Sequence, residues 1–118
     1  MQSLPTSETD LCERLARLSP QLGQMWKEHI ADNFGEPLPH LFVGEVAAWF
    51  SAVDEPSKDP VRLEVCHQLE AGLRDAPNEV KELIQVSFVE NLDRDRLKTT
   101  SKCFGPALRT DLERAFGV

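Results

Sequence analysis

Three histidines are the first residues to consider for chemistry, because imidazole binds metal ions and transfers protons near neutral pH. His29 follows Glu28, but no second histidine stands four residues further on, so the zinc-protease pattern His-Glu-x-x-His is missing. His67 is next to Cys66, and neighbours on a helix point to different sides and cannot bind one metal together. His40 stands at a proline-rich helix start, where it could satisfy free backbone donors. We therefore expect structural histidines and no metal site.

Nucleophiles are present, but no sequence pattern activates one. Cys12, Cys66 and Cys103 are odd in number, form no Cys-x-x-Cys pair and fall at apolar positions of predicted helices. Such thiols are usually small buried hydrophobes, and they indicate a reducing compartment. The chain has neither a Gly-x-Ser-x-Gly elbow nor a glycine-rich phosphate loop before a lysine. The sequence predicts a protein that is not an enzyme and uses no cofactor.

Carboxylates are abundant, and their distribution along the chain is uneven. The chain has 20 acidic and 13 basic residues, for a net charge of −7. Between Glu28 and Asp93 there are 14 acidic and 4 basic residues, a local net charge of −10. From Arg94 onward there are 6 basic and 3 acidic residues, a net charge of +3. A strongly negative surface repels phosphate backbones and attracts basic partners, so we expect a protein partner and no direct nucleic-acid binding.

Five acidic residues gather in and around the most apolar predicted helix and its flanking loops. They are Glu36, Glu45, Asp54, Glu55 and Asp59. Loops beside a rigid helix commonly carry recognition residues, so we predict that these five contact a basic partner. The alternative is that each belongs to the solvated charge that keeps a small domain soluble.

Residues that typically begin and end helices predict the elements that position these acids. A capping residue or a proline at the first helical position marks each start. The expected starts are Thr6 or Ser7, Ser19 followed by Pro20, Pro37 with Pro39, Pro60, Pro77 and Pro106. Strand signals are nearly absent, because there is no tyrosine, no hairpin turn dipeptide and no sustained alternation. The prediction is an all-α fold: one compact bundle of about six helices over residues 1–118, with residues 1–6 as a flexible tail.

Several details of this bundle can be checked against a structure. The second helix aligns an apolar set on one face: Leu22, Met25, Trp26, Ile30 and Phe34. Asp59 is expected to cap the fourth helix. The fifth helix should be one regular element, with a single face running from Val80 to Asn91. A short turn joins it to the fourth helix, so the two should pack antiparallel like one unit of a HEAT repeat. No second copy occurs at a fixed period, so an irregular bundle is equally expected. Residues 93–104 should add at most a short helix.

Neither a membrane span nor a signal peptide is predicted. The longest nearly apolar run, from Leu41 to Phe50, is interrupted by Glu45 and is too short to cross a bilayer. The N-terminus lacks a basic region followed by an apolar one. We expect a cytoplasmic protein, and the sequence leaves its oligomeric state open.

Three stretches resemble a group of small bacterial helical proteins of uncharacterised domain type. They are residues 38–49 (LPHLFVGEVAAW), 82–92 (ELIQVSFVENL) and 105–109 (GPALR). Proteins of this kind are similar in size and charge to immunity proteins of bacterial polymorphic toxin systems, which block a cognate toxin by occluding it. The resemblance implies an immunity protein whose acidic face fills a basic active-site cleft.

Two other functions compete with this expectation. An intracellular adaptor would dock helices through an apolar groove, using exposed leucines and phenylalanines of the fourth to sixth helices, and its binding would depend weakly on salt. A DNA-mimicking inhibitor of a nucleic-acid enzyme would share the electrostatics of the immunity protein and differ only in its target.

Overall fold

Serine and proline set the start of the first two helices. In the computed structural model, which describes residues 4–117, α1 spans Glu8–Ala16 and α2 spans Pro20–Asp32. The Ser7 hydroxyl accepts the backbone N–H of Asp10, and the Ser19 hydroxyl accepts that of Leu22. Both bonds satisfy donors that a helix start would otherwise leave free. The predicted caps are confirmed.

The rest of the chain is helical as well. The longer helices that follow are α3 (Pro39–Phe50), α4 (Pro60–Asp75), α5 (Asn78–Leu83) and α7 (Pro106–Phe116). The shorter elements are η1 (Pro56–Lys58), η2 (Ile84–Phe88), η3 (Val89–Asn91), η4 (Arg94–Arg96), α6 (Leu97–Thr100) and η5 (Ser101–Cys103). Residues 4–117 contain no β-strand, so the all-α prediction is confirmed.

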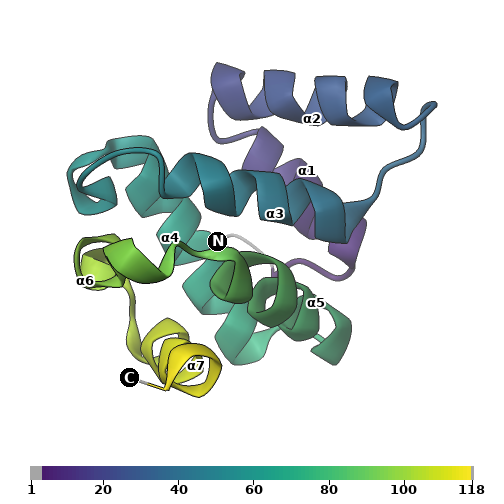
Figure 1. Ribbon diagram of the computed structural model, residues 1–118. Coiled ribbons are helices and arrows are strands. Elements are labelled where there is room, and N and C mark those ends of the chain that lie inside the picture. The colour runs from purple at the N-terminus through teal and green to yellow at the C-terminus, as the bar shows by residue number, and fades with distance from the viewer. Residues whose placement is uncertain (1–3, 118) are drawn as a thin grey trace.

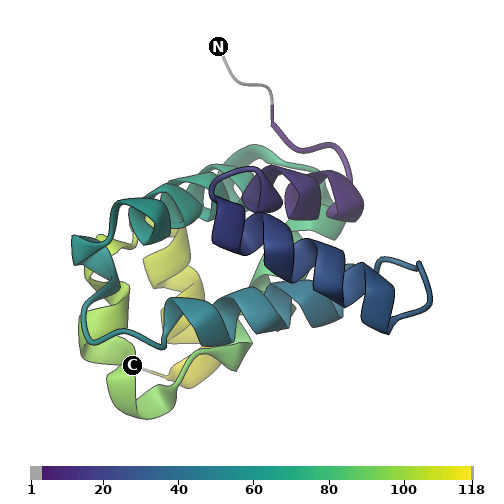
Figure 2. The ribbon, with the colours of Figure 1, turned by 90° about the horizontal axis from the view of Figure 1, so that it is seen from above.

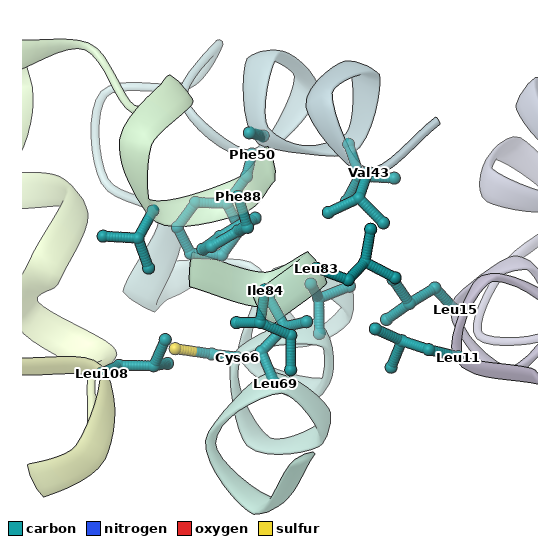
Figure 3. Close-up of a cluster of buried hydrophobic side chains, with 14 of the residues drawn as sticks. Leu11, Leu15, Val43, Phe50, Cys66, Leu69, Leu83, Ile84, Phe88 and Leu108 are labelled. Atoms are coloured by element: carbon teal, nitrogen blue, oxygen red, sulfur yellow. The ribbon is translucent and has the colours of Figure 1, made fainter. Parts of the chain in front are cut away.

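Helix α3 lies centrally in the bundle. It packs against α1, α2 and the segment from α5 to η3, while α4 and α7 pack together on another side (Figure 1). The core contains fully buried side chains from most of these helices, including Leu11, Leu15, Val43, Phe50, Leu69, Leu83, Ile84, Phe88 and Leu108 (Figure 3). Phe50 and Phe88 meet edge to face, with ring centroids 5.3 Å apart.

The turn at Ala76 and Pro77 returns the chain onto α4. Gly72 lies against the side chains of Val80 and Ile84, as expected for the predicted antiparallel pair. The fifth helix departs from the prediction of one regular element, because five residues from Ile84 to Phe88 form a π-helical turn, followed by a 3-10 turn. Asn91 donates its side-chain amide to the Ser87 carbonyl within this irregular segment.

The loops before and after α3 lie at opposite ends of that helix. The loop of residues 33–38 joins α2 to α3, and the loop of residues 51–59 joins α3 to α4 (Figures 1 and 2). Since α3 has 12 residues, its ends are about 18 Å apart. The two loops therefore offer separate surfaces.

Part of the expected N-terminal tail packs on α1. The Leu4 carbonyl accepts Arg14, Pro5 is buried, and the Thr6 backbone N–H donates to the Asp10 carboxylate. Residues 1–3 of the expected tail lie outside the described residues.

Candidate functional site

The structure divides the five predicted contact residues into two groups. Asp54, Glu55 and Asp59 belong to the loop of residues 51–59, hereafter the α3–α4 loop. Glu36 lies in the loop after α2, and Glu45 lies on α3. The two groups therefore do not form one continuous acidic surface.

Each acid of the α3–α4 loop is already paired with a cation of the same chain. Asp54 lies 3.2 Å from Arg96, although its side chain is fully exposed. Glu55 is 2.8 Å from the Lys102 ammonium and 3.0 Å from that of Lys58. The hydrogen bond from Lys102, together with that from Lys58, lowers the pKa of the Glu55 carboxyl. Two of these cations come from the basic C-terminal segment, whose role the sequence left unassigned.

Asp59 is held most firmly of the three. It occupies the N-cap position of α4, but its carboxylate makes no capping bond and accepts Arg62 at 2.7 Å instead. Capping by its side chain, as predicted, is therefore wrong. The buried Arg62 also donates to the Trp49 carbonyl at 2.7 Å and stacks 3.9 Å above the Trp49 ring. Asp59 is thus part of an internal network of α3 and α4.

The acids at the other end of α3 have no such partners. Glu45 lines a pocket together with Glu28 and Asp32, which are exposed residues of α2, and Glu36 follows Asp32 by four residues in the sequence. Within residues 4–117, no lysine or arginine forms an ion pair with any of these four carboxylates. The C-terminal end of α2 carries the negative pole of the helix dipole, which strengthens the negative potential there.

Phe34 is exposed and stands between Asp32 and Glu36 in the sequence. The sequence placed it on the apolar face of the second helix, but its side chain is 101% exposed, so this expectation is wrong. Its backbone is left-handed with φ 59°, and Gly35 follows with φ 84°, because α2 has already ended at Asp32. Two further exposed apolar residues, Leu38 and Leu41, follow in the same region. We call Glu28, Asp32, Phe34, Glu36 and Glu45 together the α2–α3 face.

His29 connects the two helices behind this face. Its ring is buried, and Nε2 accepts the backbone N–H of Leu38 at 3.0 Å. This bond satisfies a donor at the start of α3, a role that the sequence assigned to His40. Trp26 stacks on the His29 ring, with centroids 5.7 Å apart and planes 8° apart. The face therefore has a rigid base.

A serine and a histidine meet elsewhere, which the sequence did not predict. The Ser87 hydroxyl lies 2.7 Å from Nδ1 of His40, and Nε2 of His40 lies 3.8 Å from Glu8. A histidine can activate a neighbouring serine hydroxyl as a nucleophile. Ser87, however, is only 3% exposed and cannot reach a macromolecular substrate. The bond fastens the start of α3 to the π turn, so its role in this structure is to position helices.

Two of the three cysteines are brought together by the fold. The Cys66 thiol donates to the Cys103 carbonyl at 3.2 Å, although 37 residues separate them. A side-chain interaction with the Cys103 thiol, followed by burial, raises the pKa of Cys66, and the same interaction lowers the pKa of Cys103. Burial raises the pKa of Cys12 to about 12. Cys12 and Cys66 are core thiols, as predicted, while Cys103 is half-buried.

Residues 105–109, the third of the stretches that carry the family resemblance, form the start of α7, which the Glu70 side chain caps. The Glu70 carboxylate accepts the backbone N–H groups of Ala107 and Leu108 at 2.9 Å each. A Cβ on Gly105 would lie 2.6 Å from Glu70 Cδ, so only glycine fits beside this cap. Hydrogen bonds and close approaches of this kind fix the fold and identify no partner.

Comparison with known proteins gives one match. A family model described as "Domain of unknown function (DUF7674)" matches residues 12–116. The chain belongs to this family. The DUF7674 match includes all three resembling stretches and the whole α2–α3 face. No curated protein and no solved structure matches the chain.

Residues 4–117 of this DUF7674 domain carry neither a membrane-spanning helix nor a cluster of potential metal ligands. None of its helices combines the length and apolar character needed to cross a membrane. Over the same residues, no three His, Cys, Asp or Glu side chains are grouped so that they could hold a metal ion.

Proposed function

We propose that this domain is a bacterial immunity protein that neutralises a cognate toxin by covering a basic cleft with the α2–α3 face. One observation carries the proposal: Phe34 is fully exposed on left-handed backbone between Asp32 and Glu36, and no lysine or arginine of residues 4–117 pairs with the carboxylates of this region. A large aromatic side chain that a partner can bury is a candidate anchor for an interface, and charged residues commonly form the polar rim around such an anchor. A toxin that acts on nucleic acid needs a basic cleft to hold phosphates, and these carboxylates would replace them.

The energetics favour binding at this face over the α3–α4 loop. Coupling between close charge pairs at a desolvated interface is worth about 1.5–7 kcal/mol. A carboxylate of the face can contribute such a pair directly, because it has no lysine or arginine to release. Asp54, Glu55 and Asp59 would first have to leave Arg96, Lys102 and Arg62. Their role as partner contacts stays a prediction.

The backbone at Phe34 is consistent with selection for binding. A bulky residue in the left-handed region costs on the order of 1–2 kcal/mol relative to ordinary backbone. Burial of the ring would offset this cost, but the ring is exposed in the isolated domain. A partner that buries Phe34 would recover apolar contact area there. Strain of this kind is expected at functional sites.

The cytoplasm is the compartment that we propose for this interaction. The three cysteines are free, and Cys103 is half-buried, which fits a reducing environment.

The test is to measure affinity for the toxin itself. The genes adjacent to that of the domain are first examined for a large toxin-like reading frame, and affinity is then measured between the domain and an inactive variant of the encoded protein. The triple variant D32K/E36K/E45K should bind at least about a hundredfold more weakly, because three favourable charge pairs become repulsive. The salt dependence of binding should also fall.

A matched variant controls for total charge. Glu79, Glu82 and Glu113 are exposed and, within residues 4–117, have no lysine or arginine partner. The variant E79K/E82K/E113K therefore makes the same change in net charge outside the face, and it should bind almost as tightly as the wild type. Equal losses in both variants would contradict the proposal, as would equal retention of affinity.

The adaptor hypothesis stays a prediction. Among residues 4–117, the only exposed large apolar side chain after α3 is Val86, and the leucines and phenylalanines of the later helices are buried or half-buried. Binding that persists unchanged at high salt would favour the adaptor.

A further inference from the structure

A small pocket opens between α2 and α3 within the α2–α3 face. Its volume is about 160 Å³, roughly five times the volume of a water molecule in the liquid. The lining residues are Met25, Glu28, His29, Asp32 and Glu45. Met25 and Asp32 are seven residues apart, which is two helical turns, and Glu28 and His29 lie between them, so all four border the pocket from α2. Glu45 faces them from α3.

Besides the acidic residues, the buried imidazole of His29 lines this pocket. Its Nε2 accepts the Leu38 N–H, so in the neutral ring the proton is on Nδ1. Nδ1 is buried and has no hydrogen-bond partner, and it lies 3.5 Å from a carboxylate oxygen of Glu45. The Nδ1–H group of His29 therefore has no hydrogen-bond acceptor, and it faces Glu45 at the wall of the pocket. Stacking on Trp26 and the hydrogen bond from Leu38 hold the His29 ring in this orientation.

We propose that this pocket receives the guanidinium group of one arginine side chain of the partner protein. The inference rests on the proposed function and names the chemistry recognised at that same face. Three carboxylates surround one small volume, and no lysine or arginine of residues 4–117 pairs with them. A cation from outside the domain is the complementary ligand.

Arginine fits this arrangement better than lysine. Its planar guanidinium has five N–H donors spread around its edge, whereas an ammonium has three on one atom. Carboxylates on two facing helices require donors that point in opposite directions, and charge-assisted bonds of this kind are the stronger ones. Met25, at the wall of the same pocket, supplies an apolar surface for the arginine stem.

The test uses the isolated domain and a short probe peptide. Acetyl-Gly-Arg-Gly-amide is titrated into the domain, and NMR follows the ring nitrogens of His29 and the methyl group of Met25. We expect saturable shifts of both signals. The same peptide with citrulline, which keeps the shape and removes the charge, should bind at least about tenfold more weakly, as should a lysine peptide.

Two variants keep the test specific to the pocket. E28Q/D32N/E45Q removes the three charges and should abolish the shifts, while E79Q/E82Q/E113Q changes net charge equally and should leave them intact. E45Q alone should weaken arginine binding without unfolding the domain, because Glu45 is an exposed residue and glutamine has nearly the same size.

Several outcomes would overturn the inference. These are the absence of saturable shifts, equal binding of the arginine and citrulline peptides, tighter binding of the lysine peptide, or the same shifts with Ca²⁺ alone. Its failure is distinct from failure of the proposed function. If D32K/E36K/E45K loses the toxin while the arginine peptide does not bind, the face is right and the pocket is wrong. If the arginine peptide binds but the toxin does not, the pocket is right and the proposed function is wrong.

Discussion

The two ends of α3 carry similar acidic residues in different electrostatic states. At the α3–α4 loop, Asp54, Glu55 and Asp59 each contact a lysine or arginine of the chain. At the α2–α3 face, within the described residues, Glu36 and Glu45 contact none. A run of acidic residues in a sequence therefore does not by itself identify a binding surface. Only the unpaired carboxylates remain available to a partner.

The difference arises from the path of the C-terminal segment. Arg96 and Lys102 return to the α3–α4 loop across 42 and 47 residues of sequence, where Arg96 also donates to the Ser51 carbonyl. Further along, Arg114 bridges Asp111 and Glu90. The basic segment therefore neutralises acids on one side of the domain, and none of its cations pairs with the α2–α3 face.

The strongest expected effect on stability is at Arg62. Replacing Arg62 with Ala should lower the free energy of unfolding by about 2–3 kcal/mol, because it leaves the Asp59 carboxylate and the Trp49 carbonyl without their donor and removes the stacking on the Trp49 ring. Urea denaturation measures the change. Arg74→Ala is the matched control on the same helix, since Arg74 is largely exposed, and it should cost less than about 0.5 kcal/mol. Equal effects would show that the loop acids are not held by internal pairing.

A smaller effect of opposite sign is expected at Phe34. Phe34→Asn should raise the free energy of unfolding by up to about 1 kcal/mol, because asparagine tolerates left-handed backbone and no packed ring is lost. Phe34→Ala is the control that removes the ring but keeps the strain, and its stability should stay near that of the wild type. Both variants should weaken toxin binding. A destabilisation by Phe34→Asn would mean that the ring packs on the domain.

The smallest effect concerns the pH dependence of the α3–α4 loop. The pKa of Glu55 is lowered below its ordinary value of 4.5 by the hydrogen bond from Lys102 and then that from Lys58. A lowered pKa stabilises the fold fully above pH 4.5, and this contribution disappears as the pH falls through the folded pKa. Lys102→Gln should therefore move the Glu55 titration upward toward 4.5, as measured by NMR of the side-chain carboxyl carbon.

Lys98→Gln is the control for that titration, because Lys98 is exposed and, within residues 4–117, forms no ion pair. It should leave the Glu55 midpoint in place. If both lysine variants shift the titration equally, the cause is the general charge of the segment and not a specific pair.

Much of the fold could be predicted because its signals are local. Ser7, Ser19, Pro39 and Pro60 mark helix starts within one turn of themselves, and the structure confirms each one. The end of α7 at Gly117 is also a local signal, because a glycine can adopt the left-handed backbone that ends a helix. The regular fifth helix was the main error, because the π turn at Ser87 depends on contact with α3.

The sequence by itself determined that this chain is an acidic all-α domain and where most of its helices begin. Tertiary structure decided which carboxylates are neutralised, that Phe34 faces solvent, and that His29 lies behind Glu45. The physical reason is distance along the chain. Capping and proline effects act over about four residues, whereas the pairing of Glu55 with Lys102 requires the whole bundle to form. Which end of α3 is free to bind is therefore a property of the folded molecule.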